Sequence, residues 1–241
     1  MWRFILFSWV ILSCQTPSSR LFPPESPVDF FDSRPVQQEL IVIGVAGARI
    51  SERDSLQAAL EDAALKVALY EHSVSGTFRI NEKVGDSFLD FVIESEGTID
   101  FPPAYTQYIA QLKYDPDNDI LREDGLIFVR ARYDGSSVPS IDWNLSKNWI
   151  KNPPRFKDFL VGVGCAYRIN PKDSYIGSYQ NAFLAIVRSA DTRIYAETVE
   201  TQGSFNRETG SVSQSSLSNF YIIAVQKDKD GKVYTLAIAK K

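Results

Sequence analysis

The sequence is poor in the residues that most often carry catalysis or bind transition metals. It has one His, two Cys and one Met among 241 residues. A structural zinc site needs several Cys or His ligands, and a disulfide framework needs several paired cysteines. The composition therefore excludes both, and it leaves His72 as the sole candidate for histidine-based catalysis.

An excess of positive charge is also missing. Lys plus Arg number 26 against 30 Asp plus Glu, which gives a net charge of −4. Nucleic-acid binders need Lys and Arg to neutralise phosphates, so we expect no nucleic-acid partner. With 44% hydrophobic and 23% charged residues, the chain has the composition of a globular protein of one large domain or two small ones.

No apolar run is long enough to cross a bilayer, which takes about 20 residues. The longest candidate is 4–12, which follows Arg3 and contains one Ser. A positive residue followed by a short apolar run is typical of a secretion signal. A buried first strand or helix is the alternative interpretation.

The residues after this run resemble the bacterial lipobox. Ile11-Leu12-Ser13-Cys14 has an aliphatic residue three before the Cys and a small residue just before it. The resemblance implies that 1–13 is a lipoprotein signal peptide and that Cys14 carries a diacylglycerol and an N-acyl chain, palmitate among them. Residues 14–37, rich in proline, are then a flexible tether.

The body shows internal similarity between residues 40–54 and 159–173, with Gly44 aligned to Gly162. Each segment is an apolar, β-rich run that leads into a helix start. Ser51 and Asn170 are good N-caps, and Pro171 suits a first helical position. Apolar residues then recur at three-and-four spacing, which predicts one long amphipathic helix in each copy.

Alternating residues predict strands after each helix, at 77–80 and 87–94 in the first copy and at 193–200 in the second. A hairpin is expected to close each copy. The first joins strands 108–114 and 126–133 through an acidic loop, and the second joins 220–226 and 233–239 through Asp230-Gly231.

The predicted fold class is therefore α+β, with two tandem repeats that each pack one long helix on an antiparallel sheet. The first repeat spans 38–135, a linker spans 136–148, and the second repeat spans 149–241. Sequence leaves open whether the two repeats share one core.

The second repeat resembles the Lpp-twenty family of bacterial envelope lipoproteins. The resemblance rests on Trp149-Ile150 before Pro153-Pro154, then the Gly162-Val163-Gly164 strand and an Ala-containing helix, over about residues 148–200. The N-terminal domain of the flagellar-ring protein FlgT is similar. A weaker echo at 39–75 lacks the Trp and Pro-Pro opening. The resemblance implies an accessory or assembly role in the envelope and provides no catalytic residues.

Two glycine-containing turns and one acidic loop are candidate ligand sites. Gly44-x-x-Gly47 and Gly162-x-Gly164 precede helices, as in phosphate-binding loops, but they lack the third glycine, so close packing of strand and helix is favoured. Asp115, Asp117 and Asp119 have the spacing of a calcium loop without its Gly and Glu, which makes them a weak calcium candidate and otherwise a solvated turn.

The remaining candidates are single residues and aromatic side chains. His72 lies near a helix end without a catalytic partner, and Cys165 lies in a strand, where a buried and inert thiol is expected. The aromatic residues could line a groove for a glycan or acyl chain, although core positions are commoner. They are Trp143, Trp149, Tyr167, Tyr175, Tyr179, Phe183 and Tyr221.

These observations predict a non-enzymatic lipoprotein with no cofactor, anchored on the periplasmic face of the inner or outer membrane. Its body would serve protein–protein contact or envelope and flagellar assembly, by exposed sheet edges. The alternative is a periplasmic carrier of a lipid or small apolar ligand. A hydrolase that uses paired carboxylates is third, but no spacing pairs them.

Overall fold

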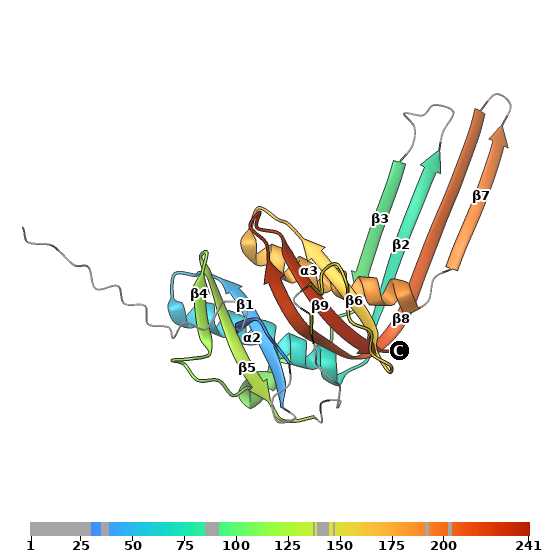
Figure 1. The fold of residues 1–241 in the computed structure, drawn as a ribbon. Coiled ribbons are helices and arrows are strands. Elements are labelled where there is room, and N and C mark those ends of the chain that lie inside the picture. The colour runs from blue at the N-terminus through green and yellow to red at the C-terminus, as the bar shows by residue number, and fades with distance from the viewer. Residues whose placement is uncertain are drawn as a thin grey trace, which may run out of the picture.

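A computed structural model describes residues 30–34, 39–84, 92–136, 138, 145–146, 148–190, 193–201 and 204–241. The fold is α+β, as predicted, with two antiparallel sheets (Figure 1). The first sheet has the order β1 (Leu40–Gly47), β5 (Leu126–Tyr133), β4 (Ile120–Glu123). The second has the order β3 (Val92–Ile99), β2 (Val74–Val84), β8 (Ser204–Lys227), β9 (Val233–Lys240), β6 (Leu160–Ala166), and β7 (Arg193–Thr201) also pairs with β8. The helices are α2 (Glu52–Glu71), α3 (Pro171–Ala190) and the 3-10 helix η2 (Tyr105–Gln111).

Both long helices begin where the capping residues predicted. Ser51 is the N-cap of α2, and its hydroxyl accepts a hydrogen bond from the Asp54 amide. Asn170 precedes α3, and its side-chain oxygen accepts from the Lys172 amide at 3.1 Å. Each cap satisfies one of the amides that a helix start leaves without an intrahelical partner.

The predicted strand at 108–114 is wrong. Residues 105–111 form η2, because Tyr108 and Leu112, four residues apart, are both buried in the core that includes α2. The strand that pairs with β5 is instead β4, joined to it by Asp124-Gly125. Both turn residues have positive φ, 53° and 71°, as a two-residue hairpin requires. The predicted hairpin of 220–226 with 233–239 is confirmed as β8 and β9.

The second sheet does not divide between the two predicted repeats. Strand β2, from the first half of the chain, pairs with β8 from Val74 opposite Leu217 to Val84 opposite Arg207. Strand β3 extends this sheet at its edge. The prediction that each repeat carries its own sheet is therefore wrong for these strands. Strands β2 and β3 come from the first half of the chain and lie in one sheet with β8 from the second half.

A four-stranded arm projects from the body (Figure 1). We define the arm as β3, β2, residues 204–217 of β8, and β7. The remainder of β8 leaves the arm and pairs with β9 in the body. Asn219, with φ of 52°, lies where β8 changes partners, and the β8–β9 register shifts between Ser218 and Tyr221. Asn tolerates this left-handed conformation better than most residues, so it suits the bend.

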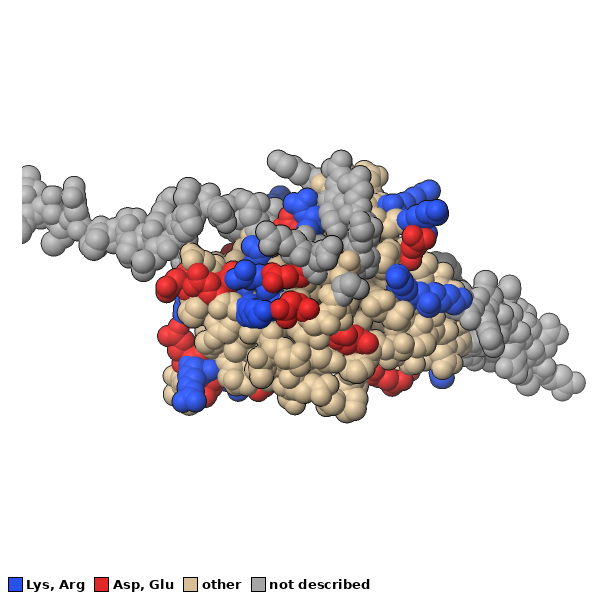
Figure 2. Space-filling view, turned by 90° about the horizontal axis from the view of Figure 1, so that it is seen from below, with Lys and Arg blue, Asp and Glu red and all other residues tan. Residues whose placement is uncertain are grey.

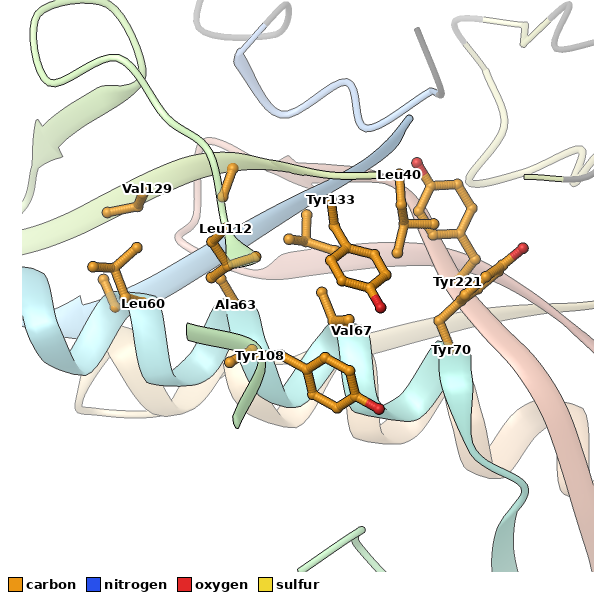
Figure 3. Packing of buried hydrophobic residues seen from close by; sticks show 14 of the residues in the cluster. Leu40, Leu60, Ala63, Val67, Tyr70, Tyr108, Leu112, Val129, Tyr133 and Tyr221 are labelled. Carbon is orange, nitrogen blue, oxygen red and sulfur yellow. The ribbon is translucent and has the colours of Figure 1, made fainter. Parts of the chain in front are cut away.

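The core lies between the helices and the two sheets. Leu60, Ala63 and Val67 on α2 face Val129 and Tyr133 on β5 (Figure 3). Tyr70 packs edge-on against Tyr221 of β8, with ring centroids 6.0 Å apart, which joins the first helix to the second half of the chain. The two halves therefore share one apolar core.

Candidate functional site

The arm presents two unpaired sheet edges. Strand β3 pairs with β2, and β7 pairs with β8, and neither has a second neighbour among the described strands. An edge strand carries a row of backbone N–H and C=O groups that can pair with another chain. The arm therefore offers two sites where an added strand would extend a sheet.

One face of the arm is held by α3. A Cβ on Gly76 would lie 2.6 Å from the ring of Phe183, and the Arg188 guanidinium lies over the Phe78 ring at 5.8 Å. Since strand residues alternate between faces, the intervening residues point away from α3. They are Thr77, opposite Thr98, and Arg79, opposite Glu96. These four residues line an open polar surface of the arm.

Helix α2 carries a mostly buried ion pair that forms hydrogen bonds with the backbone at the outer edge of β1. Lys66 Nζ lies 2.7 Å from Asp62 Oδ2, and both side chains are 10% exposed. Asp62 accepts from the Val45 amide at 2.8 Å, and Lys66 donates to the Ile43 carbonyl. Together the two side chains replace the hydrogen bonds that a neighbouring strand would supply.

Helix α3 closes over this pair. The ring of Tyr179 lies 5.0 Å from Lys66 Nζ. Burial raises the pKa of Tyr179 well above its ordinary value, and the charge of Asp62 raises it further. Nearby, the buried hydroxyls of Ser178 and Thr235 lie 2.6 Å apart. These contacts join α2, β1, α3 and β9. We call the residues that make them, Asp62, Lys66, Ser178, Tyr179 and Thr235, the seam cluster.

The cavity beside the seam cluster is small. Its volume is about 30 Å³, and its lining includes Tyr175, Tyr179 and Tyr221. Pockets for small molecules span about 300–1,000 Å³. Three of the aromatic residues proposed for a ligand groove therefore surround room for little more than a water molecule.

The other aromatic candidates are scattered. Phe183 and Trp149 are buried, whereas Tyr167 is 64% exposed. Trp143 lies outside the described residues. The structure therefore does not bring the seven aromatic residues together into one groove.

In the glycine-containing turns, Gly44 and Gly164 serve close packing. A Cβ on Gly44 would lie 1.9 Å from the Ala59 carbonyl oxygen, and one on Gly164 would lie 2.0 Å from that of Ser178. These contacts fall inside the helices rather than at their N-termini, where anions bind. By contact Gly44 corresponds to Gly164, which corrects its alignment with Gly162. The alternative to phosphate binding, a strand that passes close under a helix, accounts for both positions.

The acidic loop folds on itself. Asp115 accepts hydrogen bonds from the Asp117 amide at 3.0 Å and from the Asn118 side chain at 2.7 Å, and these bonds lower the pKa of its carboxyl. Asp119 accepts from the Asp115 amide at 2.8 Å. Within the described ranges, no three His, Cys, Asp or Glu side chains form a group that could hold a metal ion.

His72 and Cys165 lie apart. His72 follows α2, where its amide donates to the Ala68 carbonyl and its ring lies 3.0 Å from the Tyr108 hydroxyl. Cys165 is half-buried in β6, and its carbonyl accepts from Asn181. Cys14, the predicted lipidation site, lies outside the described residues.

Sequence reasoning missed the seam cluster. Its signal was an Asp and a Lys four residues apart on α2, among the Ala and Leu residues of the buried stripe. Such a pair usually lies on a solvent face, so periodicity alone did not identify it. The tyrosine that closes it comes from α3, more than a hundred residues later.

Comparison with known proteins yields no relative. No family model, no curated protein and no solved structure matches the chain. In the part of the chain that the structure describes, the helices are too short or too polar to cross a bilayer. On the face seen in Figure 2, acidic and basic side chains of the described residues are interspersed rather than gathered by sign.

Proposed function

We propose that the protein is a non-enzymatic bacterial lipoprotein that is held to a membrane of the cell envelope through acyl chains on Cys14 and that binds an envelope protein through its arm. The observation that carries this proposal is the arm itself, in which β3 and β7 each lack a second neighbour among the described strands. A strand from a partner can pair with such an edge, where main-chain hydrogen bonds supply affinity.

The anchor rests on the lipobox-like residues 11–14 and the short apolar run before them. The chain after the proline-rich segment docks on the body. The Ser33 amide donates to the Ile223 carbonyl at 2.9 Å, and Phe31 packs edge-on against Phe128 with centroids 5.0 Å apart. The tether would thus end at a fixed point on the folded protein.

A tandem origin of the two halves, with the Lpp-twenty resemblance of the second, is the finer part of the proposal. Three shared details support it. Gly44 and Gly164 make the same close approach to a helix. Ser55 and Ser174 each accept from an amide six residues earlier, at 2.8 Å. The strand order β1-β5-β4 also corresponds to β6-β9-β8, and each order has a helix against its first strand.

The polar clusters of the body support a non-enzymatic role. Lys66 and Asp62 are engaged with each other and with the β1 backbone, and Ser178 with Thr235. Catalysis needs such groups within reach of a substrate. The small cavity gives the carrier alternative no support at this position.

Site-specific photocrosslinking in cells tests the contact. A photoreactive residue replaces Thr98 on β3 in one variant and Asp117 in the acidic loop in a control variant. Both positions are exposed. We expect Thr98 to yield a discrete crosslinked band with an envelope protein and Asp117 to yield none.

A crosslink from Asp117 with none from Thr98 or from a probe at Glu96 would contradict the role of the arm. Expression and folding of each variant are checked by protease resistance. Neither exposed position contributes to the core, so the variants are expected to fold.

A further inference from the structure

Two isoleucines are fully exposed at matching positions. Ile50 is 109% exposed and Ile169 is 103% exposed, and each lies in the turn before a long helix. Nearby Tyr167 is 64% exposed. The turns are fixed rather than frayed, because the amides of Arg49 and Arg168 each donate to a buried serine hydroxyl at 2.8 Å. The protein therefore holds these apolar side chains in water.

A chain of contacts places both turns at one end of the molecule. The Ala48 amide, beside Ile50, donates to the Gly125 carbonyl at 2.8 Å. Asp124 forms an ion pair with Lys227 at the end of β8. The β8–β9 turn follows, and a Cβ on Gly231 would lie 3.6 Å from the Tyr167 ring. Figure 1 shows α2 and α3 beginning at this end and the arm at the other.

Residues 30–34 contact the body at this same end. Val225 donates to the Phe31 carbonyl, and Ser33 donates to that of Ile223. The segment therefore runs antiparallel to β8, with Phe30 on the side of Lys227 and the β8–β9 turn. Fifteen residues, 15–29, separate Cys14 from Phe30. They span at most about 50 Å when extended.

We infer that this end of the protein lies on the membrane surface, with Ile50 and Ile169 inserted among the lipid headgroups. The inference rests on the proposed anchor at Cys14, which would hold this end near the bilayer. Exposed Arg49 and Arg168 directly precede the isoleucines and favour anionic lipid. Glu52, Asp54 and Asp173 on the same turns offset part of that attraction. Apolar contact is therefore the main contribution.

This orientation separates the two surfaces. Helix α3 begins just after Ile169, and twenty residues of helix span about 30 Å. Phe183 and Val187, in its second half, lie against Gly76 at the base of the arm. The arm would point away from the membrane, toward an envelope partner.

Depth-dependent fluorescence quenching tests the inference. The full chain carries Cys165→Ala and one new cysteine, Ile50→Cys or Ile169→Cys, with Glu96→Cys on the arm as the matched control. All three positions are exposed, so labelling does not disturb the core. Each labelled protein is reconstituted into vesicles of phosphatidylethanolamine and phosphatidylglycerol with brominated acyl chains. We expect the emission of a label at 50 or 169 to shift to the blue, and its quenching by the brominated chains to be several-fold stronger than that of a label at 96.

Equal, weak quenching at all three positions would overturn the inference, as would stronger quenching at 96. A blue shift at 50 and 169 without vesicles that grows with protein concentration would also overturn it, because a second copy would then cover the isoleucines. Intact mass decides the anchor separately. If the parent carries the acyl mass and quenching at 50 and 169 is still no stronger than at 96, the inference is overturned while the anchor stands. If the parent lacks the acyl mass, the anchor and the inference that rests on it both fail.

Discussion

Gly44 and Gly164 set the distance between strand and helix in both halves of the body. The space that a side chain would need at either position is occupied by helix backbone. A side chain can rotate away from a clash, whereas a helix backbone moves only with its whole element. These glycines therefore fix how closely α2 approaches β1 and α3 approaches β6.

We expect Gly44→Ala to lower the free energy of unfolding by about 3 kcal/mol, because α2 must shift to admit the methyl group. Gly47→Ala is the control on the same strand, since a Cβ added at this position would have nothing within 4 Å. Its effect should stay within about 1 kcal/mol of zero. Urea unfolding followed by circular dichroism measures both, and equal effects would contradict the packing role.

Buried tyrosines make the fold sensitive to alkali. Burial and the charge of Glu71 raise the pKa of Tyr133 to about 12. Burial likewise raises the pKa values of Tyr175, Tyr179 and Tyr221. Between the ordinary pKa near 10 and these raised values, the folded state holds protons that the unfolded state has lost. Stability is therefore complete below about pH 10 and falls as pH rises toward about 12.

The urea midpoint should accordingly decrease as pH rises above about 10. Tyr133→Phe should show a smaller decrease than the parent, because it removes one of the titrating groups. A midpoint that stays constant to about pH 11, or the same decrease in both proteins, would contradict this account.

At the scale of elements, the seam cluster holds α2, β1 and α3 together. Lys66→Met leaves the Asp62 carboxylate buried without its cation. We expect this to cost about 3 kcal/mol, as for other buried ion pairs that lose one partner. The comparison is Lys113→Met, which removes an exposed ion pair with Asp134. This second substitution should leave the thermal midpoint unchanged. An equal loss of stability in both variants would contradict the role of the seam cluster.

Local sequence signals predicted the elements that depend on neighbouring residues. Ser51, Asn170 and Pro171 predicted the starts of α2 and α3 through capping. Asp124-Gly125 is an equally clear turn signal, but the prediction placed it within the acidic loop after 108–114 and so missed the strand directly before it. The correct strand, β4, has only four residues.

Long-range pairing was beyond local signals. The pairing of β2 with β8 joins residues more than 120 positions apart, and the sequence of neither strand indicates which strand it pairs with. The contact of Tyr179 with Lys66 likewise joins residues more than a hundred positions apart. The α+β class and the helix faces could therefore be predicted, whereas the arm and the seam cluster could not.

At the scale of the whole molecule, the proposed orientation links three features. Residues 30–34 and the two exposed isoleucines lie at one end, and the arm, whose outer strands lack a second neighbour among the described strands, lies at the other. An anchor at Cys14 would place one end on lipid and present the other to a partner. This orientation therefore depends on the anchor at Cys14.

Detergent phase partition with intact mass, in a bacterial host that processes lipoproteins, tests the anchor most directly. The parent chain is compared with Cys14→Ser. We predict that the parent enters the detergent phase with the mass of a chain that starts at Cys14 and carries acyl groups, and that the variant lacks that mass. If parent and variant both stay in the aqueous phase and neither carries an acyl mass, the protein is not a lipoprotein, which contradicts the proposed anchor and the orientation that depends on it.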